Sequence, residues 1–324
     1  MPDPSLPAAG PVTLVVGEAL VDVVHRPDGS VTESPGGSPA NVALTLGRLG
    51  RSPQLLTALG EDARGTRVAD WLTASGVTVR GLRSQRTSTA TAVLGSDGAA
   101  QYTFVLSARL RSDGPTAAEV LHVGSISSLL DPDAATVAAA VDAATGTALI
   151  SFDPNIRPLL IPDDGADAVR ERVRLLRARS AVVKASDEDV AWLHPGADPR
   201  AVARAWAEEG AALVVVTLGA GGAFAVHRGV DVEIAGVPVD VVDTVGAGDT
   251  LMGALLDGLL TLGVSGPGAA DRLTALATAD IAAVLRRAAA AAAVTVSRAG
   301  AEPPTRAELD AAVPSTGQGA RTDG

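Results

Sequence analysis

The chain has 324 residues, 47% of them hydrophobic, which is enough for one large domain with a sizeable core. Its formal net charge of -11 argues against nucleic acid and anionic membranes as main partners, since neither is attracted to an acidic protein. No cysteine is present, which excludes disulfides, thiolate nucleophiles and cysteine-based metal sites and is typical of a cytoplasmic protein. Residues 1–11 are rich in proline and lack the apolar core of a signal peptide.

Apolar runs and amphipathic segments alternate along most of the chain. The expected strands cover residues 12–16, 55–59, 120–123, 149–152, 181–183 and 213–218. The expected helices cover residues 66–75, 133–144, 166–177, 200–209, 247–260 and 273–293. Another helix is expected to begin with Ser38 as its N-cap and Pro39 as its first residue, and to end at Gly50. This alternation predicts an α/β fold with a parallel sheet and crossover helices.

Two segments interrupt the alternation. Residues 21–32 and 87–105 are β-like, the second with a turn at Ser96, Asp97 and Gly98, and neither has a helix beside it. We expect a small β appendage, a lid built from about residues 21–33 and 87–110, over one end of the sheet. The folded domain should span residues 12–313, between an N-terminal extension (1–11) and a flexible tail (314–324).

The most informative segment runs from Asp243 to Asp249 and contains Gly246, Ala247 and Gly248 directly before a helical pattern. Glycines let consecutive backbone N–H groups point the same way, and the helix N-terminus adds partial positive charge. Such a site binds phosphate oxygens and stabilises charge in a transition state. A carboxylate beside it can accept a proton from a hydroxyl nucleophile. An ordinary N-capped helix is the alternative explanation of this segment.

Other candidate segments also follow expected strands or begin helices. Ligands collect at the carboxyl ends of parallel strands. Taken alone, each segment also has a structural explanation: a surface position for Asp22, and a turn or a helix cap for the others. The segments are Asp22, Gly36 to Asn41, Asp153-Pro154-Asn155-Ile156-Arg157, Lys184 to Asp189, and Thr217 to Gly222.

Several absent motifs narrow the function. No Gly-x4-Gly-Lys-[Ser/Thr] occurs, so the chain is not a P-loop enzyme. No Gly-x-Gly-x-x-Gly follows the first strand, which disfavours a dinucleotide-dependent oxidoreductase. The four histidines have no metal-ligand spacing, and there is no Gly-x-Ser-x-Gly.

Taken in order, the segments resemble the ribokinase-like (PfkB) carbohydrate kinases, most closely the fructokinase branch. The likeness covers about residues 12–304 and includes both family signatures, at residues 36–50 and 243–256. The resemblance implies a three-layer α/β/α domain with a mostly parallel sheet and a small β lid. It also implies transfer of the γ-phosphoryl group of ATP to a sugar hydroxyl.

The resemblance further implies a role for each matched residue. Asp249 matches the catalytic base, and the amides of Gly246, Ala247 and Gly248 match the anion hole. The implied sugar-binding residues are Asp22, Gly36, Gly37, Asn41 and Arg157, and the implied ATP-binding residues are Lys184, Thr217, Gly219 and Gly222. The resemblance implies that Glu188 or Asp189 holds Mg²⁺ through water. It also implies a site for a monovalent cation such as K⁺, formed by Asp243, Val245 and Ser297. The family's Asn-x-x-Glu motif reads Ser186-Asp187-Glu188-Asp189 here, and an adenine-site asparagine falls on Ala289.

The substrate stays open between related sugars. Fructose is the first expectation, a 2-keto-3-deoxy sugar acid the second and a nucleoside the third. A non-catalytic sugar-binding regulator is the alternative from another class, and the intact Asp249 argues against it. The expected partners are therefore a small sugar and ATP, without nucleic acid or membrane, and a homodimer stays open.

Overall fold

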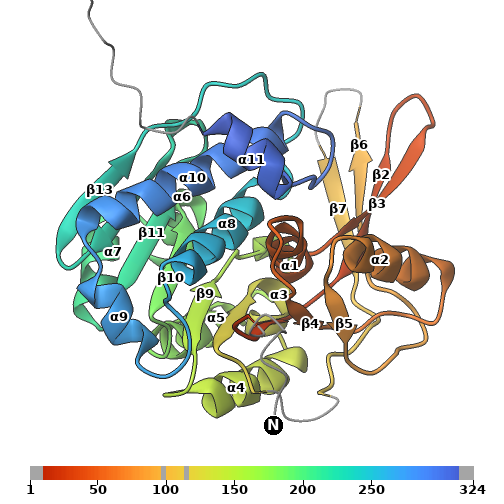
Figure 1. The fold of residues 1–324 in the computed structure, drawn as a ribbon. Coiled ribbons are helices and arrows are strands. Elements are labelled where there is room, and N and C mark those ends of the chain that lie inside the picture. Colours follow the sequence, from red (N-terminus) through yellow and green to blue (C-terminus); the bar gives the residue numbers. More distant parts are fainter. Residues whose placement is uncertain (1–9, 96–99, 113–116, 314–324) are drawn as a thin grey trace, which may run out of the picture.

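The computed structural model describes residues 10–95, 100–112 and 117–313, and over these residues two sheets form (Figure 1). The strands of the large sheet are β1 Thr13–Val16, β4 Gln54–Leu56, β5 Thr78–Arg80, β8 Val120–Gly124, β9 Leu149–Asp153, β10 Val182–Ser186, β11 Leu213–Thr217, β12 Ala223–His227 and β13 Val230–Ile234. Their order is β13-β12-β11-β10-β9-β8-β1-β4-β5. The strands from β11 to β5 are parallel, and β12 and β13 continue the sheet in antiparallel fashion. The expected mostly parallel sheet is confirmed.

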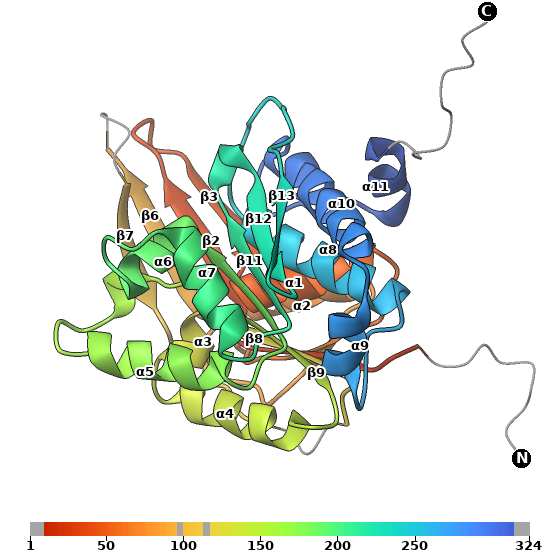
Figure 2. The same ribbon diagram turned by 90° about the vertical axis from the view of Figure 1, so that its left-hand side faces the viewer.

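Helices cover both faces of this sheet (Figure 2). One face carries α1 Ser38–Arg48, α2 Ala63–Ala74, α8 Ala247–Thr261, α9 Ala269–Ala275, α10 Thr278–Val296 and α11 Arg306–Ala312. The other face carries α3 Ser125–Leu129, α4 Asp133–Ala144, α5 Ala166–Arg177, α6 Asp187–Leu193 and α7 Pro199–Glu208. The three-layer expectation is therefore confirmed. Among the described helices, none is long and apolar enough to cross a membrane.

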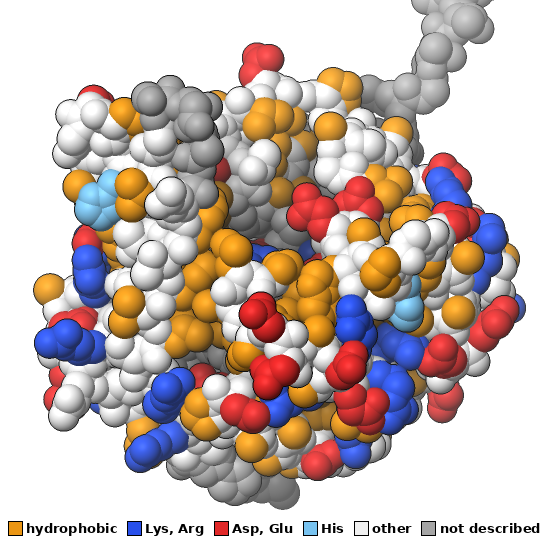
Figure 3. Space-filling view, turned by 180° about the vertical axis from the view of Figure 1, so that it is seen from behind, with side chains coloured by type: hydrophobic (Ala, Val, Ile, Leu, Met, Phe, Trp, Pro, Cys, Tyr) orange, Lys and Arg blue, Asp and Glu red, His pale blue; other side chains and the backbone are white. Residues whose placement is uncertain are grey.

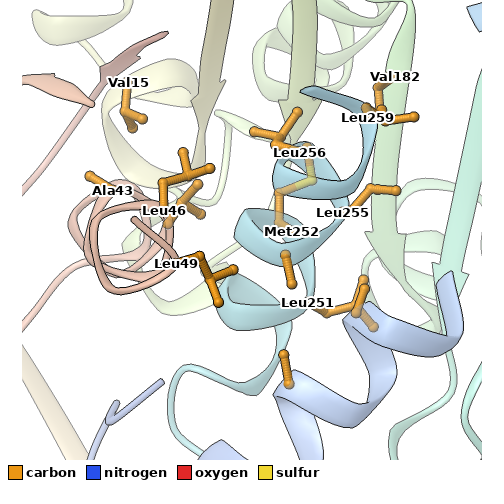
Figure 4. Packing of buried hydrophobic residues seen from close by; sticks show 14 of the residues in the cluster. Val15, Ala43, Leu46, Leu49, Val182, Leu251, Met252, Leu255, Leu256 and Leu259 are labelled. Carbon is orange, nitrogen blue, oxygen red and sulfur yellow. The ribbon is translucent and has the colours of Figure 1, made fainter. Parts of the chain in front are cut away.

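Two hydrophobic cores result from the alternation of side chains along the strands. On β1, Val15 belongs to the core under α1 and α8, whereas Leu14 and Val16 belong to the core under α3 to α7. Figure 4 shows the first core, in which Met252 and Leu255 of α8 are packed among side chains from α1, β1 and β10. Helix α8 is buried along most of its length, so its first turn has a fixed position relative to the sheet.

The small sheet has the order β3-β2-β6-β7 and is formed by the two segments that interrupt the helix–strand alternation. Its strands are β2 Leu20–His25, β3 Val31–Gly36, β6 Thr89–Leu94 and β7 Ala100–Val105. It consists of two antiparallel hairpins joined by parallel pairing of β2 with β6. Residues 96–98, the expected turn, and the tail at 314–324 lie outside the described residues.

Three expectations about individual elements are wrong. Residues 273–293 do not form one helix: α9 ends at Ala275, and α10 begins at Thr278. Ser38 is not an N-cap, because Gly37 occupies that position and the Ser38 hydroxyl bonds to another helix. The strand expected at 55–59 ends at Leu56. Strands β12 and β13 were not expected from the sequence pattern.

Candidate functional site

A cleft of about 700 Å³ opens where the carboxyl ends of the parallel strands face the small sheet. Glu18, Ser125, Asn155, Ser186 and Thr217 line it, each at or just beyond the end of a different strand. The small sheet contributes Leu20, Asp22, Ala90, Tyr102 and Phe104. In Figure 3 the surface is hollowed between the small sheet, on the left, and the larger part of the molecule.

Asp249 lies at the floor of this cleft, in the first turn of α8, and is 6% exposed. Its Oδ1 accepts hydrogen bonds from the Ser38 hydroxyl at 2.7 Å and from Asn155 Nδ2 at 3.3 Å. Its Oδ2 accepts one from Asn41 Nδ2 at 2.8 Å. Three donors from α1 and the loop after β9 therefore fix the orientation of the carboxylate, which faces the cleft.

The turn before Asp249 needs glycine. Gly246 is the N-cap of α8 with φ of 75°, a left-handed conformation that other residues rarely adopt. A Cβ on Gly246 would also lie 2.6 Å from Ala301 Cβ. In this turn the N–H of Ala247 makes only a long bond of 3.4 Å to the carbonyl of Thr244, and Gly246, Ala247 and Gly248 all line the cleft. This arrangement can bind an anion next to the Asp249 carboxylate.

Asp22 lies on the other side of the cleft, on β2. Burial raises its pKa to about 6; Arg157 opposes this shift, and Asp249 and Asp243 add to it. Gly36 leaves room for this carboxylate, because a Cβ there would lie 2.1 Å from Asp22 Oδ2 and would displace it. Gly37, Asn41 and Arg157 also line the cleft, so four of the five expected sugar-binding residues do so and Gly36 supports one of them.

The expected ATP-binding residues are only partly brought together. Lys184, Thr217 and Gly219 line the cleft. Gly222 is not among the lining residues; it has φ of 92°, and a Cβ on it would lie 2.2 Å from the carbonyl oxygen of Ile234. Gly222 thus shapes the turn into β12.

The residues expected near Mg²⁺ differ in what they can still bind. Asp189 accepts the N–H of Ile156 at 2.7 Å through Oδ1, and the N–H and hydroxyl of Ser186 through Oδ2. Glu188 is exposed at the cleft. No three Asp, Glu, His or Cys side chains come together as a metal cluster within the described residues. This donor set fits an ion that keeps most of its water, as Mg²⁺ commonly does.

The residues expected to hold a monovalent cation lie around one loop. Asp243 accepts the N–H of Val245 at 3.0 Å and the N–H of Gly300 at 2.9 Å. The N–H groups of Val242 and Asp243 donate to the carbonyl of Val296, next to Ser297. Asp243 therefore organises the segment that leads into α8.

Sequence reasoning missed several residues of this site. Ser38 was expected to cap a helix, and the contact of Asn155 with Asp249 joins residues 94 positions apart. Glu18, the stacked pair Tyr102 and Phe104, and the buried Asp153 were not singled out for a role. The signal available for Asn155 and Asp153 was their position directly after an apolar strand.

A three-layer α/β domain with a carboxylate in a glycine-led helix turn, facing a cleft at the strand ends, has the architecture of a small-molecule kinase. Comparison with known families makes this specific: the chain matches the pfkB family of carbohydrate kinases over residues 13–308. The chain belongs to that family and is a sugar kinase, a phosphotransferase with an alcohol group as acceptor.

Curated and solved relatives agree with this assignment. A fructokinase of Rhizobium leguminosarum bv. trifolii is 36% identical over 267 residues, which is 76% of this chain and 81% of that protein. The structure of a Xylella fastidiosa fructokinase with bound ATP has a TM-score of 0.80 at 27% identity and covers 93% of this chain and 97% of its own.

A Vibrio cholerae O395 fructokinase with fructose, ADP and calcium bound has a TM-score of 0.79 at 26% identity, covering 94% of this chain and 99% of its own. A double mutant of that enzyme is described with fructose, ADP and potassium bound; it has a TM-score of 0.77 at 28% identity, covering 93% of this chain and 98% of its own.

Proposed function

We propose that this protein is an ATP-dependent fructokinase. The observation that carries the proposal is the position of Asp249, held by three donors at the floor of the cleft and next to the glycine-led start of α8. A carboxylate in this position accepts a proton, and the adjacent N–H groups stabilise negative charge. We propose fructose as the sugar because the similar proteins are named fructokinases.

In the proposed reaction Asp249 removes the proton from a fructose hydroxyl as its oxygen attacks the γ-phosphorus. The new O–P bond forms while the bond from the γ-phosphorus to ADP breaks, and ADP leaves with that electron pair. The amides of Gly246, Ala247 and Gly248 stabilise the charge on the transferring group. Asp22 and Asn41 orient the sugar, and Thr217 and Gly219 contact the nucleotide.

Two ions belong to the proposal. Glu188 would hold Mg²⁺ through water, rather than Asp189, because both Asp189 oxygens already accept hydrogen bonds. The ion would supply positive charge to the phosphate oxygens. A potassium ion is proposed beside the loop of Asp243, Val245 and Ser297. The V. cholerae relative with bound potassium supports a cation in this group of proteins.

We also propose that the small sheet acts as a lid over the sugar. Tyr102 and Phe104 of β7 stack with ring centroids 6.4 Å apart and line the same cleft as Asp249. Closure of this sheet would exclude water, which otherwise competes with the sugar hydroxyl as nucleophile.

A 2-keto-3-deoxy sugar acid is the second candidate substrate, because Arg157 lines the cleft and can pair with a carboxylate. Arg109 and Arg111, which follow the small sheet in sequence, are not among the described lining residues. The test is kcat/KM for fructose against 2-keto-3-deoxygluconate on one preparation. We expect a preference for fructose; a clear preference for the acid that Arg157→Met abolishes would contradict the proposal.

A further inference from the structure

The floor of the cleft contains a buried ion pair. Lys184 on β10 and Asp153 at the end of β9 lie on adjacent parallel strands, and Lys184 Nζ donates to Asp153 Oδ2 at 2.7 Å. The two side chains are 4% and 0% exposed. Lys184 is the only lysine in a chain whose other basic residues are all arginine. A compact ammonium in place of the usual guanidinium indicates a local requirement at this position.

The Lys184 ammonium can donate more hydrogen bonds than it makes among the described residues. Of its three N–H groups, one has an acceptor among the described residues, namely Asp153 Oδ2. The side chain lines the cleft, so the remaining two N–H groups can reach a ligand. A buried ion pair with unused donors costs stability, and such a cost is commonly retained for function.

Lys184 also reaches the start of α8. A Cβ placed on Gly248 would lie 2.9 Å from Lys184 Nζ. Gly248 does not have a positive φ, so its backbone conformation alone does not require glycine. The missing side chain instead leaves room for the ammonium beside the amides that face the proposed phosphoryl group.

The surroundings keep Lys184 charged. Burial alone would lower the pKa of Lys184, but Asp153, Asp189 and Asp249 outweigh it and raise that pKa. Burial raises the pKa of Asp153, and the Lys184 ammonium opposes this shift because it favours the ionised carboxylate. The neighbouring His122 stays neutral, because burial and then Lys184 lower its pKa to about 3.

We propose that Asp153 is a positioning residue: its carboxylate holds the Lys184 ammonium beside Gly248, where the two free N–H groups bind the transferring phosphoryl group. The inference rests on the proposed phosphoryl transfer at the same site. It assigns a role to Asp153 and places the Lys184 ammonium against the backbone of Gly248.

A double-mutant cycle tests the pair. Lys184→Met removes the charge at similar length, and we expect kcat to fall about 10²–10³-fold with fructose KM changed less than about threefold, as for loss of one transition-state donor. Asp153→Asn should lower kcat by about tenfold or more. The double variant should have the kcat of Lys184→Met, because Asp153 acts through Lys184.

Stability separates this role from a structural one. Each single variant leaves a buried group without its partner and should lower Tm, whereas the double variant removes both charges and should regain much of the loss. A double variant that regains kcat together with Tm would overturn the proposal. So would a double variant whose kcat loss equals the product of the two single losses.

Nucleotide affinity measured without sugar tests the role of Lys184 independently of which sugar is the acceptor. Titration of wild type with MgATP and with AMP should show a preference for MgATP, which Lys184→Met reduces about tenfold or more. If wild type does not phosphorylate fructose and this reduction is still seen, the proposed fructokinase function fails and the inference stands. An unchanged preference overturns the inference.

Asp257→Asn is the matched control. Asp257 is a buried carboxylate on α8 that accepts from Arg51 Nε at 2.7 Å and from Arg306 Nη1 at 2.7 Å, and it does not line the cleft. For Asp257→Asn we expect a lower Tm than for wild type, whereas kcat and the preference for MgATP over AMP should stay within about twofold of wild type. Equal losses of kcat in Asp257→Asn and Lys184→Met would show that the effect is general to buried ion pairs.

Discussion

At the scale of single residues, the cleft concentrates carboxylates that the fold keeps partly buried. Glu18 has a pKa raised by burial, although the N–H of Ser127 donates to it at 3.0 Å. The pKa of Asp22 is raised to about 6 by burial, with Arg157 opposing and Asp249 and Asp243 adding to the shift. Burying charge for ligand binding lowers stability, and this pattern is typical of functional sites.

Asp22 gives a prediction with a defined sign. Its pKa of about 6 in the folded protein lies above the 3.8 of an ordinary aspartate. The native state therefore binds more protons between these two values, and stability falls as the pH rises through that window. Asp22→Asn should therefore raise Tm at pH 8 relative to wild type. It should also raise fructose KM by about tenfold or more, since an ionised carboxylate is a strong hydrogen-bond acceptor.

The measurement is a set of Tm values from pH 4 to 8 together with fructose kinetics at pH 8. For wild type, kcat/KM should fall as the pH drops below about 6, and the variant should show a weaker fall, because Asp22 no longer contributes to it. A variant with lower Tm at pH 8 and unchanged KM would show that Asp22 has a structural role only.

At the scale of elements, the start of α8 combines a strained cap with the proposed anion hole. Gly246→Ala places a Cβ at a φ of 75° and 2.6 Å from Ala301 Cβ. We expect a loss of about 1–3 kcal/mol of stability. We also expect a fall of about 10²-fold in kcat, because the amides that face the phosphoryl group must shift.

Gly50→Ala is the control for Gly246→Ala. Gly50 has φ of 78° after α1, but a Cβ there has no atom within 4 Å, and it does not line the cleft. Stability should fall by about 1 kcal/mol with kcat unchanged. If both variants keep wild-type kcat, the glycine-led turn does not bind the phosphoryl group.

The loop before α8 carries the proposed cation. Activity should rise when K⁺ replaces a bulky organic cation at equal ionic strength, and Asp243→Ala should remove this response. Equal rates in both salts would leave Asp243 with the loop-stabilising role indicated by its bonds to the N–H groups of Val245 and Gly300.

At the scale of the whole molecule, local patterns predicted more of the fold than of the site. Helices α4 and α5 have the predicted bounds because their apolar residues repeat with helical spacing. The break between α9 and α10 at Leu276 and Ala277 was missed, because no glycine or proline marks it.

The site depends on contacts that no local pattern contains. Asp249 was predicted from its glycine-rich turn, whereas Ser38 bonds to Asp249 across 211 positions of sequence. Lys184 was placed near the nucleotide, but its pairing with Asp153 depends on the order of β9 and β10 in the sheet. Strand order and side-chain direction decide these partners, and neither follows from the residues nearby.

The central claim is that Asp249 is the base of an ATP-dependent fructokinase, and transfer of label from γ-labelled ATP to fructose tests it most directly. Asp249→Asn keeps the shape of the side chain and removes proton acceptance. We predict fructose phosphate with wild type, and kcat lower by about 10²–10⁴-fold in the variant with fructose affinity nearly unchanged. A variant that keeps more than about a tenth of wild-type activity, or a wild type that transfers no label to fructose, would contradict the account.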